Sequence, residues 1–285
     1  MVLQEKVTVA ILMATYNGAI YLEEQIKSIL SQTYSNWLLY IHDDGSSDAT
    51  VQIINDYCDK FPDKIVYMKD EHQHRGAADS FLWMLKQVNA DYYMFADQDD
   101  VWLPNKIQNA MNIMLDLEKN NSLSIPILYH TDLVVVDSEL NTISSSLWRF
   151  SHLLNIIDNP LLYSINNIVT GCTMLINKQC KNVLLFEDKD VLMHDYWILL
   201  YVLKNKGVVY SNYKADILYR QHGNNVLGCA GYSTSLKKRM LNIKRSLYYN
   251  YRIYRSVNRI LGMSLFKYLY AKSLCSQKML GKVEK

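Results

Sequence analysis

The stretch YYMFADQDDVWLPNKI, residues 92–107, joins a short apolar run to a cluster of carboxylates, and it decides the fold class. The run from Tyr92 to Ala96 is typical of a buried strand, and Pro104 suits the first turn of a helix that we expect to follow. Asp97, Asp99 and Asp100 fall between them within four positions. Because neighbouring carboxylates repel one another, such a turn needs a compensating partner.

Short apolar runs and helical periods alternate through the residues that precede this stretch. We expect strands at 7–14, 37–41, 65–68 and 92–96, and helices at 21–32, 77–88, after Pro104, and from a cap at Ser47 or Asp48 through Cys58. This order predicts an α/β fold, a mostly parallel sheet flanked by helices. The strand ends read ATYNG (14–18), HDDGSSD (42–48) and ADQDD (96–100). Ligands bind at that edge of such sheets, so these ends predict the site.

The second half is less regular. We expect one strand or a broken pair at 128–137, strands at 173–176, 208–210 and 215–219, and a helix at 192–203. From residue 236 onward, 13 Lys and Arg but one acidic residue accompany apolar residues at helical spacing. We therefore divide the chain into a globular part, 1–231, and a basic amphipathic helical extension, 232–285. Such an extension suits an anionic membrane, or else packs on the body or on a second subunit of a homo-oligomer. Nothing besides charge favours nucleic acid.

The composition is that of a soluble protein, with 285 residues of which 49% are hydrophobic. Five scattered cysteines without a CxxC pair favour a reducing compartment. The first residues do not have the layout of a signal peptide, and no apolar run approaches the ~20 residues of a spanning helix. We therefore expect a cytoplasmic protein. The sequence has no GxxxxGK[ST] loop, no GxGxxG after the first strand and no GxSxG elbow, which argues against kinases, dinucleotide oxidoreductases and α/β-hydrolases.

Several polar residues allow both a chemical and a structural interpretation. Asp97 and Asp99 flank one residue, so both can bind a hard divalent cation that also contacts a nucleotide diphosphate. Asp195, beside His194 in an apolar run, is either a general base or a helix N-cap. His222 is a metal ligand or an ordinary loop residue, and Arg75 pairs with a phosphate or lies at the surface. His74 and His130 receive no functional assignment.

Taken in order, these stretches resemble the inverting family 2 glycosyltransferases with the GT-A fold. The resemblance covers roughly the first 225 residues. It rests on ILMATYNGAIYLEEQIKSILSQTYSNWLLYIHDDGSSDAT (11–50), FADQDDVWLPNKI (95–107), GCTMLINK (171–178), MHDYWI (193–198) and YRQHGNNVLG (219–228). The last of these is similar to a loop of the bacterial rhamnosyltransferase-like branch. Many family members have Glu-Asp where this chain has His194-Asp195, so the base is kept while its neighbour differs.

The resemblance implies a role for each matching position. It implies that the nucleoside is held by Thr15, Tyr16, Asn17 and Asp44, with Asp44 at the base and Arg75 near the base or the phosphates. It further implies that Mg²⁺ or Mn²⁺ is bound by Asp97 and Asp99, with Asp97 also contacting the donor and His222 either completing the metal shell or contacting the pyrophosphate. Asp195 is then the base that deprotonates the acceptor hydroxyl.

The implied activity is metal-dependent, inverting transfer of a sugar from a nucleotide-sugar donor to a lipid-linked or growing cell-surface polysaccharide. L-Rhamnose from a dTDP donor is the favoured sugar, and UDP-linked galactose, glucose or N-acetylglucosamine stay open. The enzyme is expected to bind peripherally to the inner face of the plasma membrane. Two rival interpretations are a nucleotidyltransferase, which needs a basic triphosphate loop that ATYNGAIY (14–21) lacks, and a non-catalytic membrane scaffold, which predicts loss of Asp97, Asp99 or Asp195.

Overall fold

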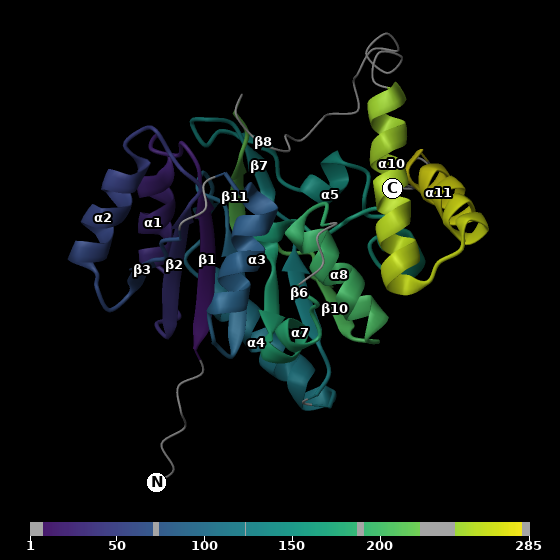
Figure 1. Ribbon diagram of the computed structural model, residues 1–285, viewed down its shortest axis with the longest axis horizontal. Coiled ribbons are helices and arrows are strands. Elements are labelled where there is room, and N and C mark those ends of the chain that lie inside the picture. Colours follow the sequence, from purple (N-terminus) through teal and green to yellow (C-terminus); the bar gives the residue numbers. More distant parts are fainter. Residues whose placement is uncertain (1–7, 71–73, 123, 187–190, 223–242, 281–285) are drawn as a thin grey trace.

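A mostly parallel sheet forms the centre of the molecule (Figure 1). The computed structural model describes residues 8–70, 74–122, 124–186, 191–222 and 243–280. Within them, the larger sheet has seven strands in the spatial order β10 (Val208–Asn212), β6 (Ile127–Thr131), β9 (Leu175–Asn177), β4 (Tyr92–Ala96), β1 (Val9–Thr15), β2 (Trp37–Asp43) and β3 (Ile65–Tyr67). The pairings of β9 with β4 and β6 are antiparallel, and the other pairings in this sheet are parallel.

A smaller sheet and the helices surround this centre. The smaller sheet has the order β5 (Val101–Trp102), β11 (Ile217–Arg220), β7 (Val134–Val136) and β8 (Thr142–Ser144). The helices are α1 (Leu22–Leu30), α2 (Thr50–Lys60), α3 (Ala77–Gln87), α4 (Lys106–Asn120), α5 (Leu147–Phe150), α6 (Pro160–Tyr163), α7 (Lys178–Asn182), α8 (His194–Lys204), α10 (Ile243–Leu261) and α11 (Leu265–Leu280), with a 3₁₀ turn, η1, at Gly171–Thr173. One core cluster joins the sheet to α3, α8 and α10, and a second joins it to α1 and α4. The predicted α/β class with helices on both faces is confirmed.

Most of the predicted elements appear within one to three residues of their expected ends, and the run at 128–137 is the broken pair β6 and β7. Three local predictions are wrong. The strand predicted at 173–176 begins at Leu175, because Gly171 to Thr173 form a 3₁₀ turn. Neither Ser47 nor Asp48 is the N-cap of α2, since the cap is Ala49 and Asp48 instead accepts a hydrogen bond from the Thr50 N–H at 3.0 Å. Pro104 lies before the first turn of α4, which begins at Lys106.

The register of the parallel strands places their carboxyl ends at one edge. Thr15 is level with Asp43 between β1 and β2, and Met13 is level with Ala96 between β1 and β4. The aspartates that follow β4 therefore emerge beside the loops that follow β1 and β2. This geometry confirms that the polar strand ends meet, as the alternating pattern predicts.

The carboxyl-terminal helices α10 and α11 pack on the body rather than extending from it (Figure 1). Ile253 and Val257 of α10 and Tyr268 and Ala271 of α11 belong to the same core cluster as α8. The predicted boundary between the globular part and the extension, at residues 231 and 232, lies outside the described residues. Within the described part of the chain, none of the helices combines the length and the apolar character that crossing a bilayer requires.

Candidate active site

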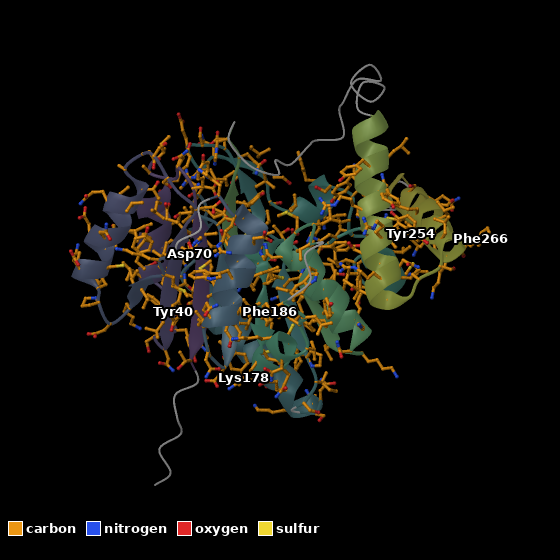
Figure 2. All side chains as sticks on the ribbon, in the orientation of Figure 1. Tyr40, Asp70, Lys178, Phe186, Tyr254 and Phe266 are labelled. Carbon is orange, nitrogen blue, oxygen red and sulfur yellow. The ribbon has the colours of Figure 1, made fainter. Side chains whose placement is uncertain are left out.

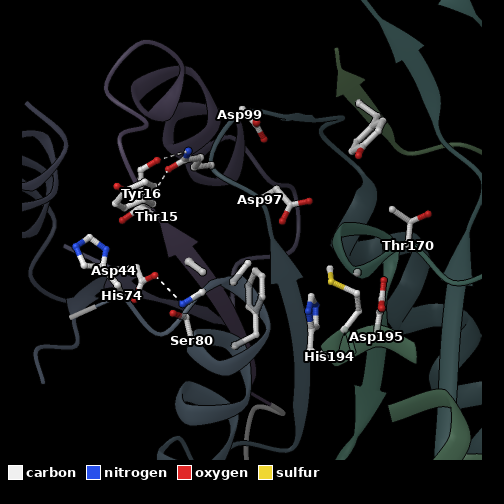
Figure 3. A pocket seen from close by; sticks show the side chains of 18 residues that line it. Thr15, Tyr16, Asp44, His74, Ser80, Asp97, Asp99, Thr170, His194 and Asp195 are labelled. Carbon is white, nitrogen blue, oxygen red and sulfur yellow. Dashed lines mark hydrogen bonds between the residues drawn. The ribbon is translucent and has the colours of Figure 1, made fainter. Parts of the chain in front are cut away.

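A cavity of about 550 Å³ opens at the carboxyl edge of the large sheet (Figure 3). Thr15, Tyr16 and Asp44 stand at one end, Asp97 in the middle, and His194 with Asp195 at the other end. These side chains come from the ends of β1, β2 and β4 and from the first turn of α8. Six of the nine predicted site residues line this one cavity: Thr15, Tyr16, Asp44, Asp97, Asp99 and Asp195.

Asp44 organises the end of the cavity assigned to the nucleoside. One carboxylate oxygen accepts the backbone N–H of Arg75 at 2.6 Å and the other accepts that of Gly76 at 2.8 Å. Gly76 has φ +79°, a left-handed conformation that disfavours a side chain. The same glycine is the N-cap of α3. Asp44 therefore fixes the loop that leads into α3, and each of its oxygens keeps a lone pair for a ligand.

Tyr16 and Thr15 are held by polar contacts with neighbouring strand ends. The side-chain amide of Gln98 accepts from the Tyr16 N–H at 2.9 Å and donates to the Tyr16 carbonyl at 3.0 Å. The Thr15 hydroxyl donates to Asp43 at 2.9 Å. The Tyr16 ring, about half exposed, meets His74 edge-on with ring centroids 5.6 Å apart. An aromatic ring and an imidazole thus stand beside Asp44 at the cavity.

Two residues predicted to touch the nucleoside do not line the cavity in this structure. The Arg75 guanidinium donates to Asp70 at 2.6 Å and lies over the Trp83 ring at 5.5 Å. Asn17 joins two loops, because its N–H donates to the Ser46 hydroxyl and its side-chain oxygen accepts the Ser47 N–H, each at 2.8 Å. Both residues support the walls, and their direct contact with a ligand stays a prediction.

The acidic loop after β4 holds several carboxyl groups close together. Burial, followed by the charges of Asp99 and Asp195, raises the pKa of Asp97 to about 7. Asp99 pairs with His222, with 2.8 Å between Oδ2 and Nε2. The structure thus brings Asp97, Asp99 and His222 to one end of β4, as the metal prediction requires, although an ion bound by all three stays a prediction.

Arg220 holds the acidic loop from the protein side. Its side chain is buried, its Nε donates to the Asp99 carbonyl at 2.8 Å, and another nitrogen donates to the Ser138 carbonyl at 2.6 Å. A further nitrogen donates to Glu24, and the Arg220 backbone N–H donates to Asp100 at 3.1 Å. In the sequence, the stretch YRQHGNN points to His222 as the candidate ligand and does not reveal that Arg220 holds the acidic loop.

Behind the loop lies a buried polar cluster that the sequence did not reveal. One potential ligand atom from each of Asp97, Asp100 and Cys172 lies within 4.8 Å of the others. Burial and the charges of Asp97 and Asp99 raise the pKa of Asp100 well above its usual range, and burial raises that of the Cys172 thiol. A protonated thiol is a poor ligand for Mg²⁺ or Mn²⁺, which prefer oxygen. We therefore interpret this cluster as a hydrogen-bonded support for the loop.

Asp195 faces the acidic loop from the first turn of α8. Burial raises its pKa to about 6, while hydrogen bonds from the backbone of Tyr196 and Gly171 and from Asn167 act in the opposite direction. Asp195 is the second residue of α8 and Met193 is the N-cap, so the alternative role of Asp195 as N-cap is excluded. A carboxyl group with a pKa near 6 is ionised at neutral pH yet basic enough to accept a proton.

His194, the residue before Asp195, packs against Phe81 and Phe95, with ring centroids 4.2 and 5.2 Å away. Burial lowers its pKa to about 3, so the imidazole is neutral. A Cβ atom on Gly171 would lie 2.6 Å from His194 Nε2, which explains why a glycine stands there. Beyond the predicted residues, the cavity is lined by His74, Ser80, Phe81, Thr170, Met193 and Tyr219. Burial, followed by the charge of Asp195, raises the pKa of Tyr249, so α10 lies near Asp195.

A mostly parallel sheet with carboxylates at its carboxyl edge, and a further carboxylate facing them across one cavity, is the arrangement that the resemblance to GT-A glycosyltransferases implies. The comparisons with known proteins agree. Residues 10–184 match the model of Glycosyl transferase family 2, and the chain belongs to that family.

Relatives and solved structures extend the comparison. The chain is 28% identical over 263 residues to the dTDP-rhamnosyl transferase RfbG of Shigella flexneri, covering 87% of this chain and 84% of that protein. It is 30% identical over 201 residues to the UDP-Glc:alpha-D-GlcNAc-diphosphoundecaprenol beta-1,3-glucosyltransferase WfgD of Escherichia coli, covering 70% and 71%. The mannosyltransferase PcManGT from Pyrobaculum calidifontis, in complex with GDP-Man and Mn²⁺, shares the fold with TM-score 0.60 and 14% identity over 95% of this chain and 70% of that one.

Proposed function

We propose that the chain is an inverting glycosyltransferase that moves one sugar from a nucleoside-diphosphate donor to a hydroxyl of a saccharide acceptor. The observation that carries this proposal is the placement of Asp195 across one cavity from Asp97 and Asp99. A single carboxylate on the acceptor side suits a single displacement, which inverts the anomeric carbon. A retaining hydrolase would need a second carboxylate as nucleophile.

The donor would lie along the cavity with its nucleoside at Asp44 and its sugar near Asp195. Asp44 would accept a hydrogen bond from the base, and Thr15 and Tyr16 would contact the nucleoside. Asn17 and Arg75 would shape this end of the site or reach the ligand after a side-chain movement. The favoured donor is dTDP-L-rhamnose, because the relative RfbG carries that nucleotide in its name. A UDP-hexose is the alternative, which the name of WfgD favours.

A divalent ion, Mg²⁺ or Mn²⁺, would fit between the donor and the acidic loop. Asp44, Asp97, Asp99 and Asp195 line the cavity, and no Lys or Arg is among its described lining residues. An anionic diphosphate would be repelled there unless a cation bound with it. Asp97 and Asp99 would hold the ion, with His222 released from Asp99 to complete the shell. When bound, the ion neutralises charge that grows on the departing diphosphate.

Asp195 would carry the proton transfer. Its carboxylate takes the proton of the acceptor hydroxyl while the hydroxyl oxygen forms a bond to the anomeric carbon. The bond from that carbon to the phosphate oxygen breaks at the same time, and the nucleoside diphosphate leaves. Asp97 and Asp99 contribute by positioning the diphosphate, and burial of Asp195 supplies the basicity.

The test combines donor binding with transfer. Thermal unfolding is measured with Mn²⁺ or EDTA against dTDP-rhamnose, UDP-glucose, UDP-galactose and UDP-N-acetylglucosamine. A ligand in excess of its dissociation constant raises stability with the logarithm of that excess. We expect one nucleotide class to stabilise the protein in Mn²⁺ and to lose that effect in EDTA. The absence of a shift with every donor in the panel would contradict the proposal.

The acceptor would be lipid-linked, because WfgD carries a diphosphoundecaprenol acceptor in its name. Residues 236–285, with their 13 Lys and Arg, would bring the enzyme to an anionic membrane where such an acceptor is held. Vesicle flotation with and without anionic lipid tests this contact. Flotation that does not depend on anionic lipid would contradict an electrostatic attraction.

A further inference from the structure

Helix α11 has apolar residues on the side that faces away from the body. Leu265 is 48% exposed, Phe266 87%, Leu269 54% and Tyr270 65%. Figure 2 shows Phe266 at the outer rim of the molecule. The opposite side of the same helix, with Tyr268, Ala271 and Cys275, is buried against the body. The outward group, Leu265, Phe266, Leu269 and Tyr270, is called the α11 patch below.

The α11 patch has the spacing of a continuous helical face. Its members stand at positions i, i+1, i+4 and i+5, so neighbouring turns place them side by side. Single exposed apolar residues are common on proteins, but a contiguous group on one helix marks a surface that is covered in use. The other side of α11, with Tyr268, Ala271 and Cys275, already packs on the body. The α11 patch is therefore open to contact with a partner.

The charge around the α11 patch favours a bilayer over a second copy of the chain. Neither α10 nor α11 contains an aspartate or a glutamate, and Arg255, Arg259, Lys267 and Lys278 of these helices are exposed. A symmetric contact between two copies would place basic helices opposite one another, which is unfavourable. An anionic lipid surface attracts the same residues, while its hydrocarbon region accepts the apolar side chains.

We propose that the α11 patch inserts into the acyl region of an anionic membrane, with Phe266 the deepest residue and Lys267 extending back to the headgroups. This inference rests on the proposed peripheral membrane contact and adds to it a hydrophobic component at a defined place. Electrostatic attraction is screened at high salt, because the Debye length shortens from ~10 Å at about 0.1 M to ~3 Å at about 1 M. Insertion of apolar side chains resists salt, so the two components can be separated.

The test uses the full chain, because α10 and α11 bury part of the core. Flotation on vesicles of phosphatidylglycerol and phosphatidylcholine is measured at low salt and at about 1 M NaCl. The double variant Phe266→Ser/Leu269→Ser is compared with wild type and with Leu115→Ser/Ile143→Ser, which removes two exposed apolar side chains from α4 and β8. We expect wild type and the control pair to stay bound at high salt. Loss of the two α11 side chains should weaken vesicle partition roughly 30-fold.

Three results would overturn the inference. Release of the wild-type protein at high salt would mean that the contact is electrostatic alone, and the peripheral contact itself would stand. Equal partition of the α11 variant and wild type would place the insertion elsewhere. A wild-type dimer in size-exclusion chromatography that the α11 variant converts to a monomer would identify a second copy as the partner. Donor binding and transfer are measured separately in solution, so a failure of the proposed enzymatic function would be recognised independently.

Discussion

Asp97→Asn should stabilise the metal-free protein while removing its response to the metal. The pKa of Asp97 is raised from 3.8 to about 7, chiefly by burial and then by the charges of Asp99 and Asp195. A carboxyl group whose pKa is higher in the folded than in the unfolded state favours folding when protonated. Its contribution to stability is therefore full at low pH and is lost as the pH rises toward 7. Asparagine carries no charge and avoids this loss.

The magnitude follows from the shift. One pKa unit corresponds to about 1.4 kcal/mol, so the difference between 3.8 and about 7 amounts to roughly 4 kcal/mol at about pH 8. At about pH 5 the same linkage gives less than roughly 2 kcal/mol, because most Asp97 is then protonated in the folded state. A gain of about 4 kcal/mol corresponds to a rise in Tm of roughly 8 °C or more for a domain of this size.

The assay is thermal unfolding in EDTA at about pH 5 and about pH 8, repeated with Mn²⁺. Asp63→Asn, at an exposed aspartate in the turn before β3, is the matched control and should change neither the pH dependence nor the response to Mn²⁺. The reasoning is refuted if Asp97→Asn melts below wild type at the higher pH, or if its gain is the same at both pH values. An undiminished stabilisation of the variant by Mn²⁺ would reject Asp97 as a ligand.

Three other changes have definite expected outcomes. Asp195→Asn should lower the transfer rate by ~10²–10⁴-fold and leave the donor dissociation constant, measured by calorimetry, unchanged. Wild-type kcat/KM should fall as the pH drops below about 6, because burial raises the pKa of the Asp195 carboxyl group to about 6. A loss of donor affinity in the variant would contradict the assignment of Asp195 as the base. Arg220→Lys should lower the free energy of unfolding in urea by roughly 2–4 kcal/mol, because lysine cannot reproduce the planar set of contacts to Asp99, Ser138 and Glu24. An unchanged urea midpoint would contradict that role of Arg220. Gly171→Ala should lower transfer at least roughly tenfold by displacing His194, and transfer at the wild-type rate would contradict that contact.

The alternating elements and the edge that carries the site could be predicted from the sequence because they depend on local patterns. An apolar run such as Tyr92 to Ala96 has few conformations that bury it, and parallel strands bring their carboxyl ends together. Asp44 and Asp97 therefore could be placed at one edge without coordinates. Asp195 attracts attention because an ionisable residue in an apolar run is costly unless it is paired or used, but that pattern alone left a helix N-cap open, and its role as a base is what the resemblance implies.

The supports of the site could not be predicted, because they join residues far apart in sequence. The Gly171 contact with His194 is a matter of a few tenths of an ångström and depends on how α8 packs on η1. Cys172 meets Asp97 and Asp100 because the antiparallel strand β9 follows it beside β4, and a strand pattern contains no information on direction. Arg220 is one charged residue at the end of a strand, and its partners come from three separate loops and helices.

The distribution of charge around the acidic loop explains why donor affinity should depend on the ion. The buried guanidinium group of Arg220 lies behind the loop, and the cavity side presents carboxylates. Because the described lining residues include no Lys or Arg, the proposed mechanism predicts that a diphosphate binds together with a cation. A lysine fixed on the cavity side of the acidic loop would keep attracting the diphosphate product, whereas an exchangeable ion can leave together with that product. Because linkage is reciprocal, the factor by which the ion tightens donor binding must equal the factor by which the donor tightens ion binding, so each titration checks the other.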